Sequence, residues 1–574
     1  MVYSGSEFRV QSQREQDYVA NDMQLFSQLA LYRNQGFAAH FEEAAELVEP
    51  TFRNTFMFGS YNTPGEKKTT RQIDSTGALA NARFAAICDS LLTPRNMIYQ
   101  RLAASNDDLM KDRNVRLYFD TVGRLLFKHR YAPEANFSGE NHKNYRSLGA
   151  FGNMGMFIDA LDDPTLRGLR YRAIPLGELF FVEDHQGRVV GFIRWFRLTA
   201  AQAEKKWPGQ LHPSMRGALE KNSQSLFNFL HVVMPRENYD KERLDARGKR
   251  WRSCYISMEG RCLMFLQGED IEGGYNTFPL AVGRYEQGPQ EVYGRGPAMF
   301  VLPALKTLNA QKTVFLEQGH RAVAPVYITH DDGIVGFKNR PGAMNPGGVT
   351  ADGKALVHAL PTGDIQISKE MMGEERSLIN DAFLVTLFQI LVKTPQMSAT
   401  EVIERANEKG ILLAPTMGRQ QSEYIGPITN RELDLLAQMR LLPPMPPALQ
   451  EAEGEYHVIY DNPLSRLAKA QEGAGFLRTL ESVKEIVAIT GDTSLLDPFD
   501  FDTAIPEMAH QNAVPESWMA DDDQIAAKRK ARAQAQQRHD EITAAPAKAA
   551  MIKANAVAAK NGQPQPGQPQ QQPQ

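Results

Sequence analysis

Residues 369–392 decide the fold, and they read KEMMGEERSLINDAFLVTLFQILV. One stripe of this segment is polar and largely acidic, at i, i+4, i+7 and i+11: Glu370, Glu374, Ser377 and Asp381. The opposite stripe is apolar: Met372, Ile379, Phe383 and Ile390. This spacing predicts an amphipathic helix with an acidic edge.

The helix is interrupted by the sequence Lys393-Thr394-Pro395-Gln396-Met397. Pro395 has no N–H to donate and disfavours a helical conformation of the residue before it. Ser398 and Glu401 then have the spacing of a capping box, so a second helix restarts at once. We expect it to run to about Leu442, with kinks at Pro415 and Pro427.

Composition limits the class of protein. The chain has 574 residues and a net charge of −4, so it is not a basic nucleic-acid binder as a whole. Its three cysteines are too few for a disulfide framework and indicate a reducing compartment. No apolar run reaches the ~20 residues of a membrane span. The sequence near Met1 also lacks the pattern of a signal peptide. An intracellular protein, or one assembled inside a cell, is predicted.

The rest of the chain mixes helical and strand periodicity, which predicts an α+β fold. A β-rich insert at 326–360 lies between two long helices and should form the tip of a helical hairpin. Helices are expected over 14–48 (broken near 34–36), 77–92, 115–128, 298–323, 463–489 and 505–539. Strands are expected in a hairpin over 179–196, within 229–266, and over 278–285 and 456–460.

Motifs of catalysis and cofactor binding are missing. Gly59 to Thr70 resembles a phosphate-binding loop only faintly, because Glu66 intervenes before Lys67. The pair Gly294-x-Gly296 lacks the third glycine of a dinucleotide fingerprint. The sequence contains no zinc-binding His-Glu-x-x-His, no Cys-x-x-Cys and no Gly-x-Ser-x-Gly. We therefore predict no enzyme activity, no cofactor and no metal.

Several motifs that are separated along the chain carry one resemblance: Asp74-Ser75-Thr76-Gly77, Tyr99 to Leu102, Arg172-x-Ile174-Pro175-Leu176, Glu291 to Pro297, Met397 to Val402, Pro415, Arg419, Glu423 and Leu442-Pro443. Together they resemble the head-to-tail connectors, or portal proteins, of short-tailed bacteriophages. That family usually has Trp where Tyr99 stands.

The resemblance implies an elongated subunit with long stem helices, a β-rich wing and clip, a helical crown and a disordered tail. It implies a homododecameric ring at one capsid vertex, assembled in the host cytoplasm, through which double-stranded DNA is packaged and ejected. Implied partners are the major capsid protein, the terminase and tail adaptor proteins, with no membrane. The implied segments are wing 1–295, stem helix 296–324, clip 325–367, stem helix 368–392, channel loop 393–398, kinked wing helix 399–455, crown 456–545 and disordered tail 546–574.

Two groups of residues are expected to meet DNA. Glu370, Glu374 and Asp381 should face the channel, with Lys393, Thr394, Gln396 and Met397 forming its narrowest ring. The basic residues of the C-terminal tail should lie on the DNA side: Lys528, Arg529, Lys530, Arg532 and Arg538. Two alternatives stay open, namely another structural virion protein such as a tail adaptor or scaffold, and an intracellular enzyme with an unrecognised site.

Overall fold

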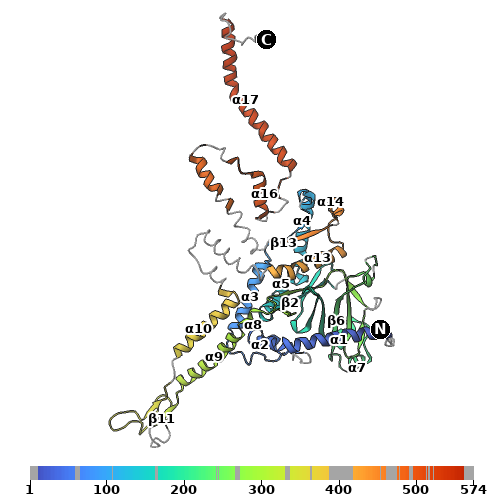
Figure 1. The fold of residues 1–574 in the computed structure, drawn as a ribbon. Coiled ribbons are helices and arrows are strands. Elements are labelled where there is room, and N and C mark those ends of the chain that lie inside the picture. Colours follow the sequence, from blue (N-terminus) through green and yellow to red (C-terminus); the bar gives the residue numbers. More distant parts are fainter. Residues whose placement is uncertain are drawn as a thin grey trace.

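A computed structural model provides the three-dimensional structure of the chain. It describes residues 11–560 apart from 58–64, 107, 162–165, 241, 244, 266–271, 330–336, 362–364, 387–417, 453, 461–474, 477–478, 490, 492–495, 512–513, 515–517 and 521. The fold is α+β, as predicted: a globular body, a helical hairpin projecting from one end, and helices on the other side that lead to the C-terminus (Figure 1).

A six-stranded antiparallel sheet forms one half of the body, in the order β4-β5-β6-β7-β8 with β9 also paired to β7. The predicted hairpin over 179–196 is confirmed, because β4 and β5 pair around a turn in which Gly187 has a φ of 74°. Helix α1 (Gln13–Gly36) covers one face, where Phe26 packs on Phe180 and Val19 joins the same buried cluster. The strands are β4 (Leu179–Glu183), β5 (Val189–Thr199), β6 (Leu226–Pro235), β7 (Trp251–Ser257), β8 (Cys262–Met264) and β9 (Gly273–Tyr275).

A three-stranded sheet and several helices form the main core. The sheet has the order β10-β2-β3, from β2 (Asn153–Ala160), β3 (Leu169–Ala173) and β10 (Leu280–Arg284). The helices packed around it include α2 (Ala38–Val48), α3 (Thr76–Leu92), α5 (Phe137–Phe151) and the one-turn α8 (Pro297–Phe300). Pro297 is at the start of α8, where its fixed φ suits the first helical position.

The glycines that resembled a nucleotide fingerprint have a packing role. A Cβ atom on Gly296 would lie 2.6 Å from the backbone nitrogen of Gly152 and 2.7 Å from the carbonyl oxygen of Leu148. The segment before α8 therefore runs directly against the C-terminal end of α5. Gly294 and Gly296 are needed because two backbones approach each other there.

A small third sheet joins distant parts of the chain. Strand β1 (Gln100–Ala104) pairs antiparallel with β13 (Tyr456–Tyr460), next to α4 (Arg113–Arg130). The short helices α6 (Ala200–Lys206) and α7 (Pro213–Lys221) pack beside β5 and β6. Thr199 caps α6 with the side-chain pattern of a capping box.

The projecting hairpin consists of α9 (Leu302–Val323), a tip and α10 (Ile365–Ala382) (Figure 1). The β-rich insert is confirmed, because β11 (Tyr327–Thr329) pairs with β12 (Val357–Ala359) at the tip. Helix α10 ends earlier than the predicted Val392. Leu384 has a left-handed φ of 60°, and the turn buries Phe383 and Val385 against the core.

The second predicted helix ends before the expected Leu442. Its described part begins at 418, passes through a π-helical turn (Gln421–Ile425) and continues as α13 (Gly426–Gln438). The irregularity predicted at Pro427 is therefore present. The prediction of one helix to about Leu442 is wrong, because Arg440 adopts a left-handed φ of 55° and the Leu441 N–H donates to the Leu436 carbonyl. A separate short helix follows, α14 (Pro447–Glu451).

The C-terminal region is helical over more of its length than predicted. Helix α16 (Phe501–Gln511) is followed by the 39-residue α17 (Asp522–Lys560), which extends away from the body (Figure 1). The prediction of a disordered tail is wrong for residues 546–560, which continue α17. Alanine is the strongest helix former, and its abundance here outweighs Pro546. Residues 561–574 lie outside the described part of the chain.

Among the described residues, no helix has the length and apolar character needed to cross a membrane.

Candidate functional site

The acidic edge predicted for residues 369–392 is present on α10. Glu370, Glu374 and Asp381 are exposed, while Met372 and Ile379 on the opposite face are 2% and 0% exposed. Glu370 accepts a hydrogen bond from Gln366 at 3.1 Å. Within the described residues, no cation forms an ion pair with any of the three carboxylates. The stripe is thus an open acidic edge of the projecting hairpin.

The predicted channel loop cannot be placed. Lys393, Thr394, Gln396 and Met397 all lie outside the described residues, as does the chain on either side from 387 to 417. The structure does describe the two ends of this stretch. The first is the turn after α10, where the ring of buried Phe383 lies 6.2 Å from the ring of Phe84 on α3. The second is the π-helical turn.

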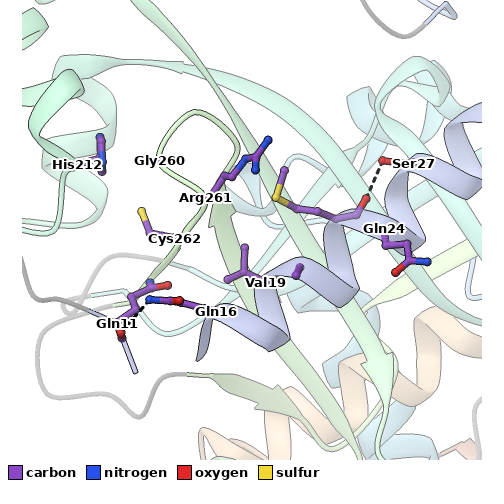
Figure 2. A pocket seen from close by; sticks show the side chains of 11 residues that line it. Gln11, Gln16, Val19, Gln24, Ser27, His212, Gly260, Arg261 and Cys262 are labelled. Atoms are coloured by element: carbon purple, nitrogen blue, oxygen red, sulfur yellow. Dashed lines mark hydrogen bonds between the residues drawn. The ribbon is translucent and has the colours of Figure 1, made fainter. Parts of the chain in front are cut away.

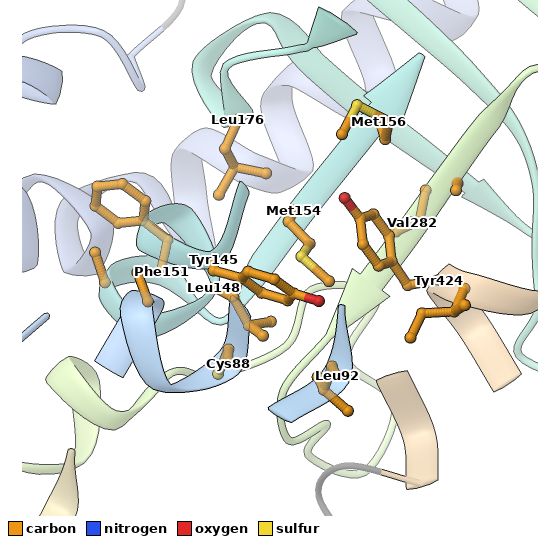
Figure 3. Close-up of a cluster of buried hydrophobic side chains, with 14 of the residues drawn as sticks. Cys88, Leu92, Tyr145, Leu148, Phe151, Met154, Met156, Leu176, Val282 and Tyr424 are labelled. Carbon is orange, nitrogen blue, oxygen red and sulfur yellow. The ribbon is translucent and has the colours of Figure 1, made fainter. Parts of the chain in front are cut away.

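The π-helical turn is held by polar contacts inside the core. The Tyr424 hydroxyl donates to Asn141 Oδ1 at 2.8 Å and accepts from Asn144 Nδ2 at 3.1 Å, and both asparagines belong to α5. Figure 3 shows Tyr424 and Tyr145 among apolar side chains from β2 and β10. Burial raises the pKa of the Tyr424 hydroxyl far above its usual range, so this group stays neutral. The described chain from residue 418 is therefore fixed in the core at this turn.

Just beyond this turn, α13 contributes a buried ion pair that the sequence analysis did not identify. Glu432 receives hydrogen bonds from Arg130 Nε at 2.8 Å and Nη2 at 2.5 Å, and from the Tyr171 hydroxyl. Burial opposes the charge of Arg130, but Glu432 outweighs it and holds the pKa of the guanidinium well above its usual range. The Tyr99 hydroxyl accepts a hydrogen bond from Arg130 Nη1 at 2.5 Å. In the sequence, the sign of this buried pair is the position of Glu432, whose carboxylate falls between the apolar positions Ile428 and Leu435.

The base of the hairpin is tied to the body by a short segment before α3. Asp74 accepts a hydrogen bond from Arg376 of α10 at 2.8 Å and one from the Thr76 N–H at 2.9 Å. Burial raises the pKa of the Asp74 carboxyl, but these two hydrogen bonds outweigh it and leave the pKa below its usual value. Asp74 therefore links the first turn of α3 to α10, while Ser75 occupies the N-cap position of α3.

The basic residues of the C-terminal tail lie on α17. Lys528, Arg529, Lys530, Arg532 and Arg538 are all exposed. Arg529 pairs with Asp502 of α16. The structure thus brings these five residues together on one helix, at the opposite end of the molecule from the acidic stripe (Figure 1).

An open groove of about 600 Å³ lies between α1 and the turn joining β7 to β8 (Figure 2). Its lining is mixed: glutamines, Val19, Met23, His212 and the buried Cys262. Burial raises the pKa of the Cys262 thiol to about 11, so the thiolate that a nucleophile requires is scarce at neutral pH. Among the described residues, no cluster of His, Cys, Asp and Glu has the arrangement of a metal site.

Comparison with known proteins gives the class of this chain. The family model described as "Bacteriophage head to tail connecting protein" matches residues 23–519. The chain therefore belongs to the family of bacteriophage head to tail connecting proteins. The resemblance noted in the sequence is thereby confirmed, and the chain is placed in a class of structural proteins of the virion.

Individual relatives carry the name portal protein. The portal protein of Salmonella phage epsilon15 is 24% identical over 528 residues, which cover 89% of this chain and 90% of that protein. A probable portal protein of Bordetella phage BPP-1 is 26% identical over 523 residues, which cover 88% and 89%. A chain from the virion of a native gene transfer agent particle aligns over 71% of this chain and 85% of its own length. Its identity is 10% and its TM-score is 0.36, which is too low to compare the two folds.

Proposed function

We propose that the chain forms a closed, dodecameric ring at one capsid vertex, with a central channel through which double-stranded DNA is packaged and ejected. The observation that carries this proposal is the α9–α10 hairpin. It projects from the body with exposed apolar side chains and an acidic edge, features that an isolated subunit leaves in water. Copies arranged head to tail around an axis would cover the apolar positions.

In this assembly the parts of the subunit take the roles that the family suggests. The body at 1–295 is the wing, 296–324 and 368–392 are the stem, 325–367 is the clip, and 456–545 is the crown. The clip faces out of the capsid, where the terminase docks during packaging and tail adaptor proteins bind afterwards. The wing contacts the major capsid protein. Assembly takes place in the host cytoplasm.

The acidic edge of α10 lines the channel in this proposal. A strongly basic lining would displace counterions from the DNA phosphates and hold the DNA, with a steep dependence on salt. An acidic lining repels the phosphates weakly and leaves the DNA hydrated, which suits a polymer that must slide. Lys393 to Met397 would form the narrowest ring, where a ring of Lys393 gives a weak contact that resists backsliding. The alternative is that the stripe pairs with basic residues of the next subunit.

Electron microscopy of the purified chain tests the ring directly. A closed ring with a central hole supports the portal function, whereas a tail adaptor or scaffold does not require one. Native mass spectrometry at high protein concentration provides a second test. A monodisperse monomer there contradicts the proposal.

The channel lining is tested by charge reversal. In the variant E374K/D381K we expect assembled rings but slower packaging or ejection, because part of the repulsive lining becomes attractive to DNA. The matched control is E220K/E242K, which reverses two exposed carboxylates on the body. Normal packaging by E374K/D381K, or a ring structure that places these side chains between subunits, contradicts the assignment.

The C-terminal helix is proposed to face the packaged DNA. Residues 524–574 carry eight Lys or Arg residues and only two acidic ones, Asp540 and Glu541. Deletion of everything after Asp523 should leave rings intact and reduce DNA retention or head filling. The alternative is a tail that only keeps the protein in solution, and it predicts unchanged filling. Loss of ring assembly on truncation contradicts both.

A further inference from the structure

The α9–α10 hairpin carries large apolar side chains that the described chain leaves uncovered. Val314 is 60% exposed, Leu316 45%, Met371 51% and Leu378 53%. They lie on two packed helices that are held away from the body (Figure 1). Grouped apolar exposure of this kind marks a surface for another protein.

Helix geometry sorts some of these residues onto one side of the hairpin. The side chains of Gln318 on α9 and Ser368 on α10 meet at 3.5 Å, so they mark the line along which the two helices face each other. Val314 and Met371 are displaced from this line by small rotations of the same sense. Because α9 and α10 run antiparallel, rotations of the same sense about their two axes point to the same side of the hairpin. Leu378 follows Met371 by seven residues and continues its stripe. We call this surface side A: Val314, Met371 and Leu378.

A second apolar surface lies on the other side. Leu316, two residues before Gln318, is rotated by about 160° from the facing line in the opposite sense and lies on the outer half of α9. It follows Asn309 by seven residues on the same stripe of α9. Asn309 Oδ1 accepts a hydrogen bond from the Ile73 N–H at 2.8 Å. Asp74, the next residue, binds Arg376 of α10, so this segment covers the hairpin on that side. Ile73 itself is 42% exposed. We call this surface side B: Ile73 and Leu316.

The two surfaces match in height along the hairpin. Height along the hairpin is counted from the level of Gln318 and Ser368, with a rise of about 1.5 Å per residue. On this scale Leu316 lies ~3 Å closer to the body and Met371 ~5 Å closer. By the same measure Asn309, which binds Ile73, lies ~14 Å and Leu378 ~15 Å toward the body. In the proposed ring the hairpin runs along the ring axis, and rotation about that axis leaves height unchanged. Each residue therefore meets its counterpart of equal height on the neighbouring copy.

We propose that side A of one copy packs against side B of the next, with Met371 on Leu316 and Leu378 on Ile73. This contact rests on the proposed ring and names the surfaces that close it. The two surfaces differ, so the interface is heterologous and each copy uses one surface toward each neighbour. The acidic stripe of α10 stays outside this contact and free to line the channel.

Paired cysteines test the contact in the full-length ring. The double variants L316C/M371C and I73C/L378C each place one thiol on side A and one on side B at equal height. The three native cysteines are buried, so background cross-linking is low. Mild oxidation should give a ladder of cross-linked species, from dimers up to the closed ring, on a non-reducing gel. The matched control I73C/M371C joins the same sides at heights ~9 Å apart, beyond the reach of a disulfide, and should give no ladder.

Each other outcome overturns a distinct part of the proposal. Cross-linked dimers from L378C alone mean that side A meets itself, which excludes a head-to-tail contact. Rings seen by electron microscopy without a ladder from either double variant mean that other surfaces close the ring, and the portal function stands. Absence of rings from the unmodified chain removes the proposed function and this contact together. As a second readout, L378E should prevent ring assembly, while L226E, at an equally exposed leucine on β6, should not.

Discussion

The buried pair of Arg130 and Glu432 is the most consequential polar contact that the structure reveals. The two side chains are 1% and 0% exposed, and they join α4 to α13 across more than half of the sequence. Removal of one partner leaves a charge in the core with neither water nor a counter-charge, at a cost of about 3–5 kcal/mol. Replacement of both by apolar residues of similar size removes that penalty.

The expected shift in melting temperature follows from this cost. The entropy of unfolding is roughly 2.1 cal/mol/K per residue, so a loss of about 4 kcal/mol spread over the 574 residues lowers Tm by roughly 3 °C. A smaller cooperative unit gives a larger shift. R130M and E432L should each lower Tm by at least this amount, whereas R130M/E432L should lower it by less than either single variant.

Thermal unfolding at fixed protein concentration, followed by circular dichroism, provides the assay, because oligomers melt in a concentration-dependent way. Y171F is the matched control, since it removes one hydrogen bond to Glu432 and keeps the ion pair; we expect a smaller shift. The reasoning fails if the single variants melt within 1 °C of the parent, or if the double variant shows the sum of the two single shifts.

Three further predictions concern local features. G296A should destabilise the body or prevent folding, since its methyl group meets the Gly152 and Leu148 backbones, whereas G319A, which has open space on α9, should raise Tm slightly. Burial, then Lys206 and Arg194, hold the pKa of the His231 imidazole well below its usual value. As pH falls, this imidazole takes up a proton in the unfolded chain before it does so in the folded chain. The free energy of unfolding therefore decreases as pH drops below about 6.5. H231N should flatten this decrease in a series of Tm values measured at different pH. The pKa of the Asp74 carboxyl is also depressed, so the ionised side chain stabilises the fold above about pH 3.8 and this stabilisation is lost at lower pH. D74N should remove this loss of stability in acid. An unchanged dependence of Tm on pH in D74N would contradict the prediction.

Much of the architecture follows from the sequence because it depends on local periodicity. The amphipathic pattern of 369–382, the strand alternation in 179–196 and the β-rich insert between two helices each produce their element without help from distant residues. The resemblance of several separated motifs to the connector family was also visible before any coordinates, and the family model confirms it. The sequence likewise determined the acidic stripe, since i, i+4, i+7 and i+11 positions share a face of any α-helix.

Tertiary structure decided where helices stop and which charges are buried. Leu384 and Arg440 end their helices in left-handed conformations that nothing in a leucine or an arginine signals. The neighbours of Leu384 are buried, and Met439 and Leu441 beside Arg440 pack against the core. The pairing of Arg130 with Glu432 depends on two segments that meet only in the folded chain. The same holds for the two sides of the hairpin: periodicity placed Met371 and Leu378 on one stripe, but only the packing of α9, α10 and residues 71–74 showed which side they share. A one-dimensional pattern specifies the face of a helix, and what that face meets depends on contacts between residues that are far apart in sequence.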